Sequence, residues 1–205
     1  MLERFFPPFR YVNVPNLVTT LAASCGVAAA GAALEEAPRA ALTLLVGAIV
    51  CDRLDGVLAR KLGQTSEIGR ELDSLADAIG FGVAPAAIAF AQGFKEPHEL
   101  AALVVYVLCA IWRLAHYNVT GLAVEGGGER FSGVPTTVAA SGFVLLETGL
   151  RFADARFLHL SLLGFFAAAS VLMVAAVPFK KNGLLVKSLY LLLPAALALL
   201  WLKGA

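Results

Sequence analysis

Long apolar segments alternate with short polar breaks along the whole chain. A membrane-spanning helix needs about 20 mostly apolar residues, and seven segments approach or exceed this length: 16–34, 39–60, 67–93, 98–118, 134–150, 157–178 and 183–203. Charged residues, glycine and proline mark the breaks between them, as at 35–38 and 180–183. The pattern predicts an all-α integral membrane protein, a polytopic bundle of about six to eight transmembrane helices. Pro194 leaves open whether the last span is one helix or two.

The composition agrees with a membrane protein. Hydrophobic residues make up 59% of the 205 residues and charged residues only 15%, whereas soluble domains average about 45–50% and about 25%. The net charge of +1 excludes a nucleic-acid partner bound through a basic surface. No linker or repeat divides the chain, so we expect a single membrane domain over residues 1–205. Residues 1–15 mix charged and aromatic side chains, which is typical of an interfacial segment on the membrane surface.

The distribution of Lys and Arg predicts the orientation in the membrane. Nine of these residues fall on the side that holds the N-terminus and the loops 61–66 and 119–132, against five on the other side. Cytoplasmic loops carry the excess of positive charge. We therefore expect a multi-pass protein of the cytoplasmic membrane, with these loops in the cytoplasm.

Four aspartates lie within two of the predicted apolar spans, where charged residues are not expected. Asp52 and Asp55 are spaced i, i+3, and Asp73 and Asp77 are spaced i, i+4, so each pair lies on one helical face. Carboxylates within a membrane are costly and need a partner or a function. A short turn joins the two helices, and we expect the catalytic helix pair, residues 46–92, to bring the four carboxylates together. Such an all-oxygen set favours Mg²⁺, Mn²⁺ or Ca²⁺, and two such ions would suit phosphoryl transfer.

The same segment offers groups that suit an anion. Gly56 would let a phosphate approach the backbone closely, and the guanidinium of Arg60 fits a diphosphate. On the residues alone, a carrier for divalent cations remains an alternative, because acids in a membrane also bind permeating ions.

The spacing as a whole resembles the signature of the CDP-alcohol phosphatidyltransferase family. The chain reads Asp52-x-x-Asp55-Gly56-x-x-Ala59-Arg60, then eight residues, then Gly69-x-x-x-Asp73-x-x-x-Asp77. The resemblance implies transfer of a phosphatidyl group from CDP-diacylglycerol to an alcohol, with release of CMP. It also implies two divalent cations, Mg²⁺ or Mn²⁺, membrane lipids around the protein, and a homodimer.

The resemblance also assigns roles to individual residues. It makes the four aspartates metal ligands, with Asp77 serving in addition as the catalytic base. It places five residues at the CDP-lipid: Asn16, Thr19, Gly56, Arg60 and Ser66. From the residues alone, Asn16 equally suits a helix cap.

Flanking segments resemble the membrane-embedded phosphatidylserine synthases within this family. They include residues 64–69, 72–77, 81–86, 112–118 and 131–137. This branch implies L-serine as the acceptor. The permanent charge of Arg113 would suit the serine carboxylate or a lipid phosphate, with polar contacts from Asn118, although pairing with an acidic side chain is an equal interpretation of Arg113. The chain departs from the branch at His116, Tyr117 and Thr137. A sister enzyme that uses glycerol 3-phosphate, inositol phosphate or another alcohol is therefore the alternative.

Overall fold

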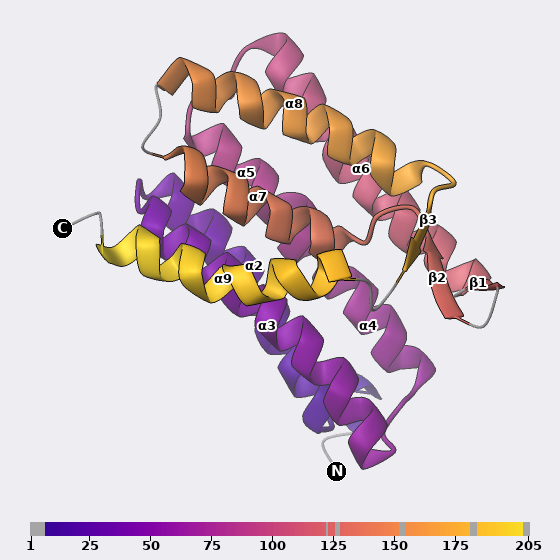
Figure 1. The fold of residues 1–205 in the computed structure, drawn as a ribbon. Helices are drawn as coiled ribbons and strands as arrows, with labels where there is room; N and C mark the ends of the chain where they lie inside the picture. Colours follow the sequence, from indigo (N-terminus) through magenta and orange to yellow (C-terminus); the bar gives the residue numbers. More distant parts are fainter. Residues whose placement is uncertain (1–6, 122, 126–127, 152–154, 181–183, 203–205) are drawn as a thin grey trace.

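The computed structural model describes residues 7–202 except 122, 126–127, 152–154 and 181–183. A short 3₁₀-helix η1 (Pro7–Tyr11) leads into the long helices α2 (Val14–Leu34) and α3 (Pro38–Leu62). A third long helical segment consists of α4 (Glu67–Asp77), the π-helical turn η2 (Ala78–Val83) and α5 (Ala84–Ala91). The helices α6 (Pro97–Thr120), α7 (Thr136–Leu150), α8 (Ala155–Val174) and α9 (Leu184–Leu202) complete the bundle (Figure 1).

The all-α membrane bundle is confirmed, and the helices match the predicted spans closely. The last span is one helix, with Pro194 inside α9. The third span is interrupted by the π-helical turn, which the apolar pattern does not reveal. The sixth span is shorter than expected, because α8 ends at Val174 and Pro178 already belongs to a strand.

Three short strands add a small sheet that the sequence did not predict. β1 (Ala123–Glu125), β2 (Gly128–Ser132) and β3 (Pro178–Lys180) pair antiparallel in the order β1-β2-β3. The sheet joins the connection after α6 to the connection after α8. Beside it, Gly133 has a φ of +80° and lies so close to α8 that a Cβ would come within 2.3 Å of the Met173 carbonyl oxygen, which only glycine allows.

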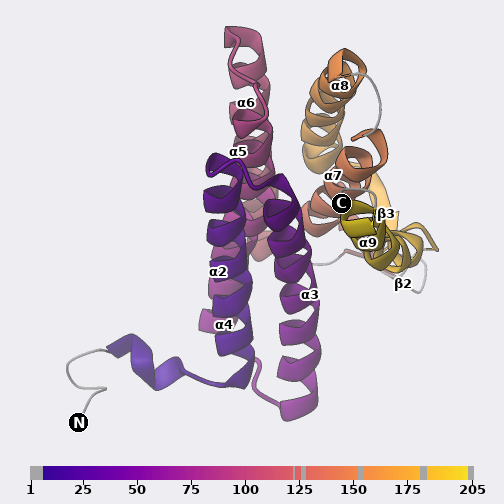
Figure 2. The same ribbon diagram turned by 90° about the vertical axis from the view of Figure 1, so that its left-hand side faces the viewer.

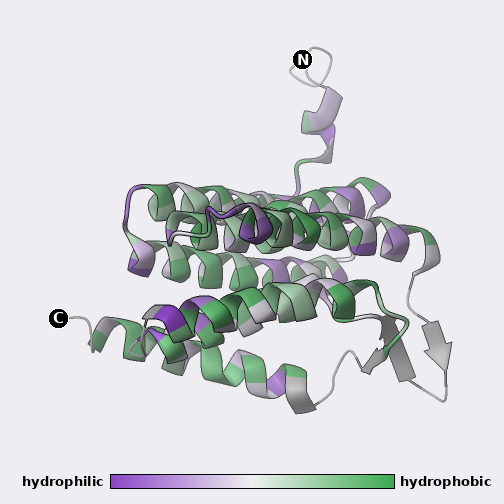
Figure 3. Ribbon diagram, turned by 90° about the horizontal axis from the view of Figure 1, so that it is seen from above, coloured by the Kyte–Doolittle hydropathy of each residue, from purple (hydrophilic) through white to green (hydrophobic). Residues whose placement is uncertain are grey.

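Among the residues that the structure describes, four helical segments are long and apolar enough to cross a membrane: Val14–Leu34, Glu67–Ala91, Pro97–Thr120 and Arg156–Val174. Two shorter apolar helices cover Thr136–Leu150 and Val186–Leu202. Helix α3 has 25 residues but concentrates its charges in its second half, around the first aspartate pair. Hydrophobic residues make up most of the length of the helices, and hydrophilic ones gather toward the helix ends (Figure 3).

The helices form two groups. α2, α3, α4, α5 and α6 pack side by side, and α7, α8 and α9 lie against one side of them (Figure 2). Contacts of α6 with α8 and of α3 with α7 and α9 join the groups. Small residues let α2 approach its neighbours closely: Ala22, Gly26, Ala29 and Ala33 are buried at spacings of three and four. A Cβ on Gly26 would come within 2.7 Å of the Gly80 Cα in η2.

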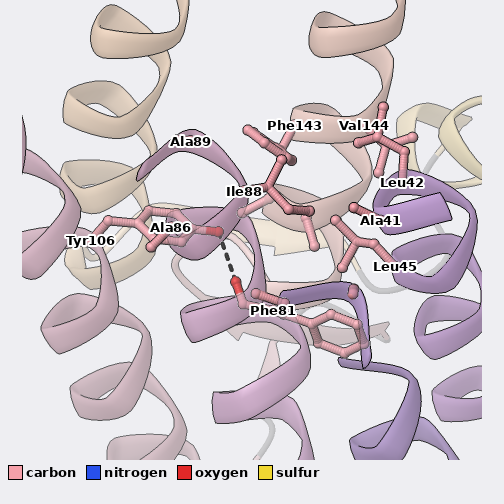
Figure 4. Close-up of a cluster of buried hydrophobic side chains, with 14 of the residues drawn as sticks. Ala41, Leu42, Leu45, Phe81, Ala86, Ile88, Ala89, Tyr106, Phe143 and Val144 are labelled. Carbon is pink, nitrogen blue, oxygen red and sulfur yellow. Dashed lines mark hydrogen bonds between the residues drawn. The ribbon is translucent and has the colours of Figure 1, made fainter. Parts of the chain in front are cut away.

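The core lies where both groups meet. Leu42, Leu45, Ile88, Tyr106 and Phe143 are fully buried there (Figure 4).

The π-helical turn has a local cause within this core. Pro85 has no N–H for the carbonyl of Phe81 four residues earlier, and the Tyr106 hydroxyl donates to that carbonyl instead at 2.8 Å (Figure 4). The hydrogen bond therefore anchors α6 to the turn that follows Asp77 directly.

Candidate active site

One aspartate of each pair, Asp55 and Asp73, and the anion-binding candidates line one cavity of about 570 Å³. α3 supplies Asp55, Gly56 and Arg60 to its wall, and α4 supplies Gly69 and Asp73. The cavity contains all five residues expected at the CDP-lipid: Asn16, Thr19, Gly56, Arg60 and Ser66. The structure thus brings together residues up to 50 positions apart in the sequence.

Helix ends position two of these residues. Asn13, and not Asn16, caps α2, since its side chain accepts a hydrogen bond from the Asn16 N–H at 2.9 Å. The Asn16 side chain instead donates through Nδ2 to the Tyr11 carbonyl at 2.8 Å, while Asn16 lines the cavity. Ser66 caps α4 by accepting from the Gly69 N–H at 3.1 Å. The cap interpretation of Asn16 was therefore wrong.

Two glycines keep the cavity open. A Cβ on Gly69 would come within 3.0 Å of both the Asn16 Oδ1 and the Ser66 Oγ. A Cβ on Gly56 would lie 3.4 Å from the Arg60 guanidinium, which follows one helical turn later. Any side chain at either position would crowd the polar atoms that face a ligand here.

Three of the four aspartates converge at one point. Asp52, Asp55 and Asp73 each offer a carboxylate oxygen, and these atoms lie within 4.8 Å of one another. Asp55 is buried and accepts a hydrogen bond from Thr19 Oγ1 at 2.6 Å, while Asp52 accepts from Thr137 Oγ1 at 3.5 Å. Like charges at this range repel one another, so the cluster has the chemistry of a site for a divalent cation with oxygen ligands.

Asp77 lies at the buried side of this cluster. All four aspartates line a second, smaller cavity, but Asp77 is not one of the three whose carboxylate oxygens converge. Thr136 Oγ1 lies 3.5 Å from Asp77 Oδ2 and accepts from Arg113 Nη1 at 3.3 Å. The threonine therefore links the buried guanidinium of α6 to the carboxylate of α4.

The smaller cavity, of about 290 Å³, holds the residues expected to bind the acceptor. Arg113 and Asn118 of α6 line it together with all four aspartates. Arg53 and Tyr190 also line it, and the Arg53 guanidinium lies 4.5 Å from the Tyr190 ring centre. The two cavities share six residues: Asp55, Gly56, Arg60, Arg70, Asp73 and Tyr117. Two of the metal-ligand candidates, Asp55 and Asp73, thus line both cavities, whereas Asp52 and Asp77 line the smaller one.

Sequence reasoning missed several residues around the aspartates. It named residues 131–137 only for their resemblance and did not predict that Thr136 and Thr137 of α7 donate to Asp77 and Asp52. It also missed Tyr190 of α9, which lines the smaller cavity. Ser74 and Glu71 of α4 were also missed, although both lie within the motif segment and contact Asn118. His116, in contrast, is exposed on α6 and touches Thr120 of its own helix.

A family model described as CDP-alcohol phosphatidyltransferase matches residues 12–202, nearly the whole chain. The chain belongs to the CDP-alcohol phosphatidyltransferase family. Members of the family are generally divalent-cation dependent, and Asp52, Asp55 and Asp73 have the arrangement to hold such an ion.

The curated relatives that match the chain are named as CDP-diacylglycerol–serine O-phosphatidyltransferases or as an archaetidylserine synthase. A CDP-diacylglycerol–serine O-phosphatidyltransferase of Mycobacterium bovis is 34% identical over 174 residues, which cover 82% of this chain and 61% of the relative. An archaetidylserine synthase of Methanothermobacter thermautotrophicus is 35% identical over 178 residues, covering 83% of this chain and 71% of the relative. A CDP-diacylglycerol–serine O-phosphatidyltransferase of Saccharomyces cerevisiae is 45% identical over 108 residues, covering 49% of this chain and 39% of the relative. The chain therefore spans 61% of the length of the mycobacterial relative.

Proposed function

We propose that the chain transfers the phosphatidyl group of CDP-diacylglycerol to L-serine, forming phosphatidylserine and releasing CMP. One observation carries this proposal: Asp55 and Asp73 line both a larger cavity with the nucleotide-binding candidates and a smaller cavity with the acceptor candidates, and Asp52 and Asp77 complete the wall of the smaller one. The names of the relatives support serine as the acceptor.

In this proposal the CDP group occupies the larger cavity. Gly56 and Gly69 leave room for it, Arg60 binds the diphosphate with its planar guanidinium, and Asn16, Thr19 and Ser66 supply polar contacts. The acyl chains extend into the bilayer. Two divalent cations, Mg²⁺ or Mn²⁺, held by Asp52, Asp55, Asp73 and Asp77, would neutralise phosphoryl oxygens and stabilise the departing phosphate.

L-Serine enters the smaller cavity, where Arg113 holds its carboxylate and Asn118 contacts it. Asp77 takes the proton of the serine hydroxyl. The hydroxyl oxygen forms a bond to the lipid-side phosphorus, and the bond from that phosphorus to the oxygen of CMP breaks. CMP leaves with the negative charge on its phosphate, so the step balances without an enzyme-bound intermediate.

The charges along the chain indicate how the protein is oriented in the membrane. We propose one membrane domain over residues 1–205, with residues 1–15 on the membrane surface and the site open to the cytoplasm. The excess of Lys and Arg at the site's end of the bundle supports this orientation. We further propose a homodimer, which chemical crosslinking in native membranes tests.

The test is release of CMP by the purified protein in detergent with Mg²⁺ or Mn²⁺. CDP-diacylglycerol and its ether-linked analogue are each offered with L-serine, glycerol 3-phosphate or inositol phosphate. We expect release that requires serine and stops when EDTA removes the cations. Asp77→Asn keeps the size of the side chain but removes the base, so it should abolish turnover while CDP-diacylglycerol still binds.

Other results would replace the proposal in part or entirely. Release with glycerol 3-phosphate or inositol phosphate alone would keep the chemistry and overturn serine as the acceptor. Full activity of Asp77→Asn would remove Asp77 from the mechanism. Transport of divalent cations without consumption of CDP-lipid would show a carrier instead.

A further inference from the structure

A chain of hydrogen bonds crosses from α4 to α6 at the edge of the smaller cavity. Ser74 Oγ donates to Asn118 Oδ1 at 3.0 Å, and Asn118 Nδ2 donates to Glu71 Oε2 at 3.1 Å. Ser74 and Asn118 line the cavity, whereas the Glu71 side chain is 56% exposed. The contact joins residues 44 and 47 positions apart in the sequence.

The Glu71 carboxylate fixes the direction of every bond in this chain. A carboxylate only accepts hydrogen bonds, so the Asn118 amide must turn its NH₂ group toward Glu71. The carbonyl oxygen of the same amide then faces Ser74, and this oxygen also only accepts. The single hydroxyl proton of Ser74 is therefore committed to Asn118, and the lone pairs of Ser74 Oγ remain available to a donor in the cavity.

Ser74 differs in this from three other serines of the bundle. Ser24, Ser141 and Ser170 donate to the carbonyl oxygen four residues earlier in their own helices. A serine within a helix commonly donates its hydroxyl proton to a backbone carbonyl of the same helix. Ser74 instead donates across to another helix at a cavity wall.

We infer that Ser74 Oγ accepts a hydrogen bond from the α-ammonium group of the acceptor, with Asn118 and Glu71 as positioning residues that keep its lone pairs turned toward the cavity. The inference rests on the proposed function and adds the group by which this site selects an amino alcohol. In that proposal the aspartates bind the divalent cations. Thr137 donates to Asp52, so it lies close to these cations, which would repel an ammonium group. Ser74 lies outside this set, and its lone pairs, turned toward the cavity by Asn118 and Glu71, suit an ammonium group better, although the Glu71 carboxylate also lies 3.9 Å from the Arg70 guanidinium.

The subsite explains selection against the alternative acceptors. Glycerol 3-phosphate and inositol phosphate carry no amine and bring a phosphate, which an oxygen acceptor backed by a carboxylate disfavours. An ammonium group, in contrast, supplies the donor that Ser74 lacks. A hydrogen bond to a charged group contributes enough binding energy for about a tenfold or larger effect on affinity.

The experiment compares Ser74→Ala and Glu71→Gln with wild type in the CMP-release assay. We expect Ser74→Ala to raise the KM for L-serine about tenfold or more, with little change in the KM for CDP-diacylglycerol. Glu71→Gln should also raise the KM for L-serine, because a glutamine side chain both donates and accepts hydrogen bonds and no longer fixes the orientation of the Asn118 amide. Ser74→Thr keeps the hydroxyl and should retain most of the serine affinity.

A serine analogue without the amine separates recognition of the ammonium from general damage to the site. 3-Hydroxypropionate, tested as a competitive inhibitor of serine transfer, should bind Ser74→Ala as well as wild type. Ser24→Ala and Glu35→Gln are matched controls, since both side chains are exposed and lie outside the two cavities, and should leave both constants unchanged.

The possible failures are distinguishable. A wild-type protein that releases no CMP with serine overturns the proposed function and this inference with it. Serine turnover in wild type with an unchanged KM in both variants overturns the ammonium subsite alone. An equal loss of affinity for serine and 3-hydroxypropionate also overturns it, because the loss would then not depend on the amine. If Ser74→Ala does not fold, Glu71→Gln decides, since its exposed side chain tolerates the change.

Discussion

At the residue scale, hydroxyl groups from other helices hold the aspartates in position. Thr19 of α2 and Thr137 of α7 donate to Asp55 and Asp52, and Thr136 stands between Arg113 and Asp77. These bonds restrict the rotation of carboxylates that would otherwise repel one another. Groups that orient metal ligands in this way typically change metal affinity or activity about 10- to 100-fold when removed.

Thr19→Val tests this orientation directly. The change keeps the shape of the side chain but removes the donor 2.6 Å from Asp55. We expect the Mg²⁺ or Mn²⁺ concentration for half-maximal activity to rise about 10-fold or more, as measured by CMP release in a metal titration. Thr20→Val is the matched control, because Thr20 is exposed and donates within its own helix to the Asn16 carbonyl. An equal change in both variants would contradict the role of Thr19.

Gly69→Ala tests the shape of the larger cavity. The new Cβ would lie within 3.0 Å of the Asn16 Oδ1 and the Ser66 Oγ, so both polar groups must shift. We expect the KM for CDP-diacylglycerol to rise about tenfold, as for the loss of one or two good contacts, with the KM for serine less affected. Gly31→Ala, where a Cβ meets nothing within 4 Å, should leave both constants unchanged. An unchanged KM in Gly69→Ala would place the nucleotide elsewhere.

At the element scale, the π-helical turn connects the core to the site. The turn begins one residue after Asp77, and its Phe81 carbonyl depends on the Tyr106 hydroxyl of α6. Pro85 cannot supply the N–H that an α-helix would offer to this carbonyl, and the Tyr106 hydroxyl donates to it instead. The turn that follows α4 is thus fixed against α6 by a hydrogen bond within the core.

Tyr106→Phe should destabilise this turn. It leaves the buried Phe81 carbonyl without its donor, which costs about 1–3 kcal/mol of folding free energy. Thermal unfolding in detergent should show a lower Tm, and kcat should fall as well because Asp77 adjoins the turn. Tyr11→Phe changes a partly exposed residue of η1 and serves as the control. A Tm equal to that of wild type would show that the Phe81 carbonyl finds another donor.

At the scale of the whole molecule, polar contacts join the two helix groups at both ends of the bundle. At one end, α7 contacts the aspartates through Thr136 and Thr137. At the other end, the buried Glu99 of α6 pairs with His159 of α8, whose ring stacks on Phe94 at 4.1 Å. Glu99 and Arg113 stand 14 residues apart on α6, or about 21 Å along the helix axis.

This separation predicts that the far end affects stability without affecting substrate binding. His159→Ala removes one partner of the Glu99 carboxylate, which still accepts from the Glu96 N–H, and should lower the free energy of unfolding. The KM values for serine and CDP-diacylglycerol should stay the same. Unfolding in detergent and steady-state kinetics at a temperature well below the Tm measure the two effects. A large change in either KM would show that the two ends are coupled.

The sequence by itself determined the helices and the acidic face, which is the helical surface that carries Asp52, Asp55, Asp73 and Asp77. Helical spans depend on local hydropathy, so seven apolar segments predicted the long helices to within a few residues at most ends. The aspartate pairs also follow from local geometry, because residues three or four apart share a helical face. The turn between the two helices is short, so even the convergence of Asp52, Asp55 and Asp73 followed from the sequence.

Only the tertiary structure decided what surrounds the acidic face. The hydrogen bonds from Thr19, Thr136 and Thr137 to the aspartates span 36, 59 and 85 residues, and no periodicity within one helix encodes such partners. The same holds for Tyr106 at the π-helical turn and for Ser74, whose direction of donation depends on an amide of α6. Local spacing fixes which side chains share a face. The packing of helices decides which groups meet that face, because those contacts arise only when distant segments are brought together.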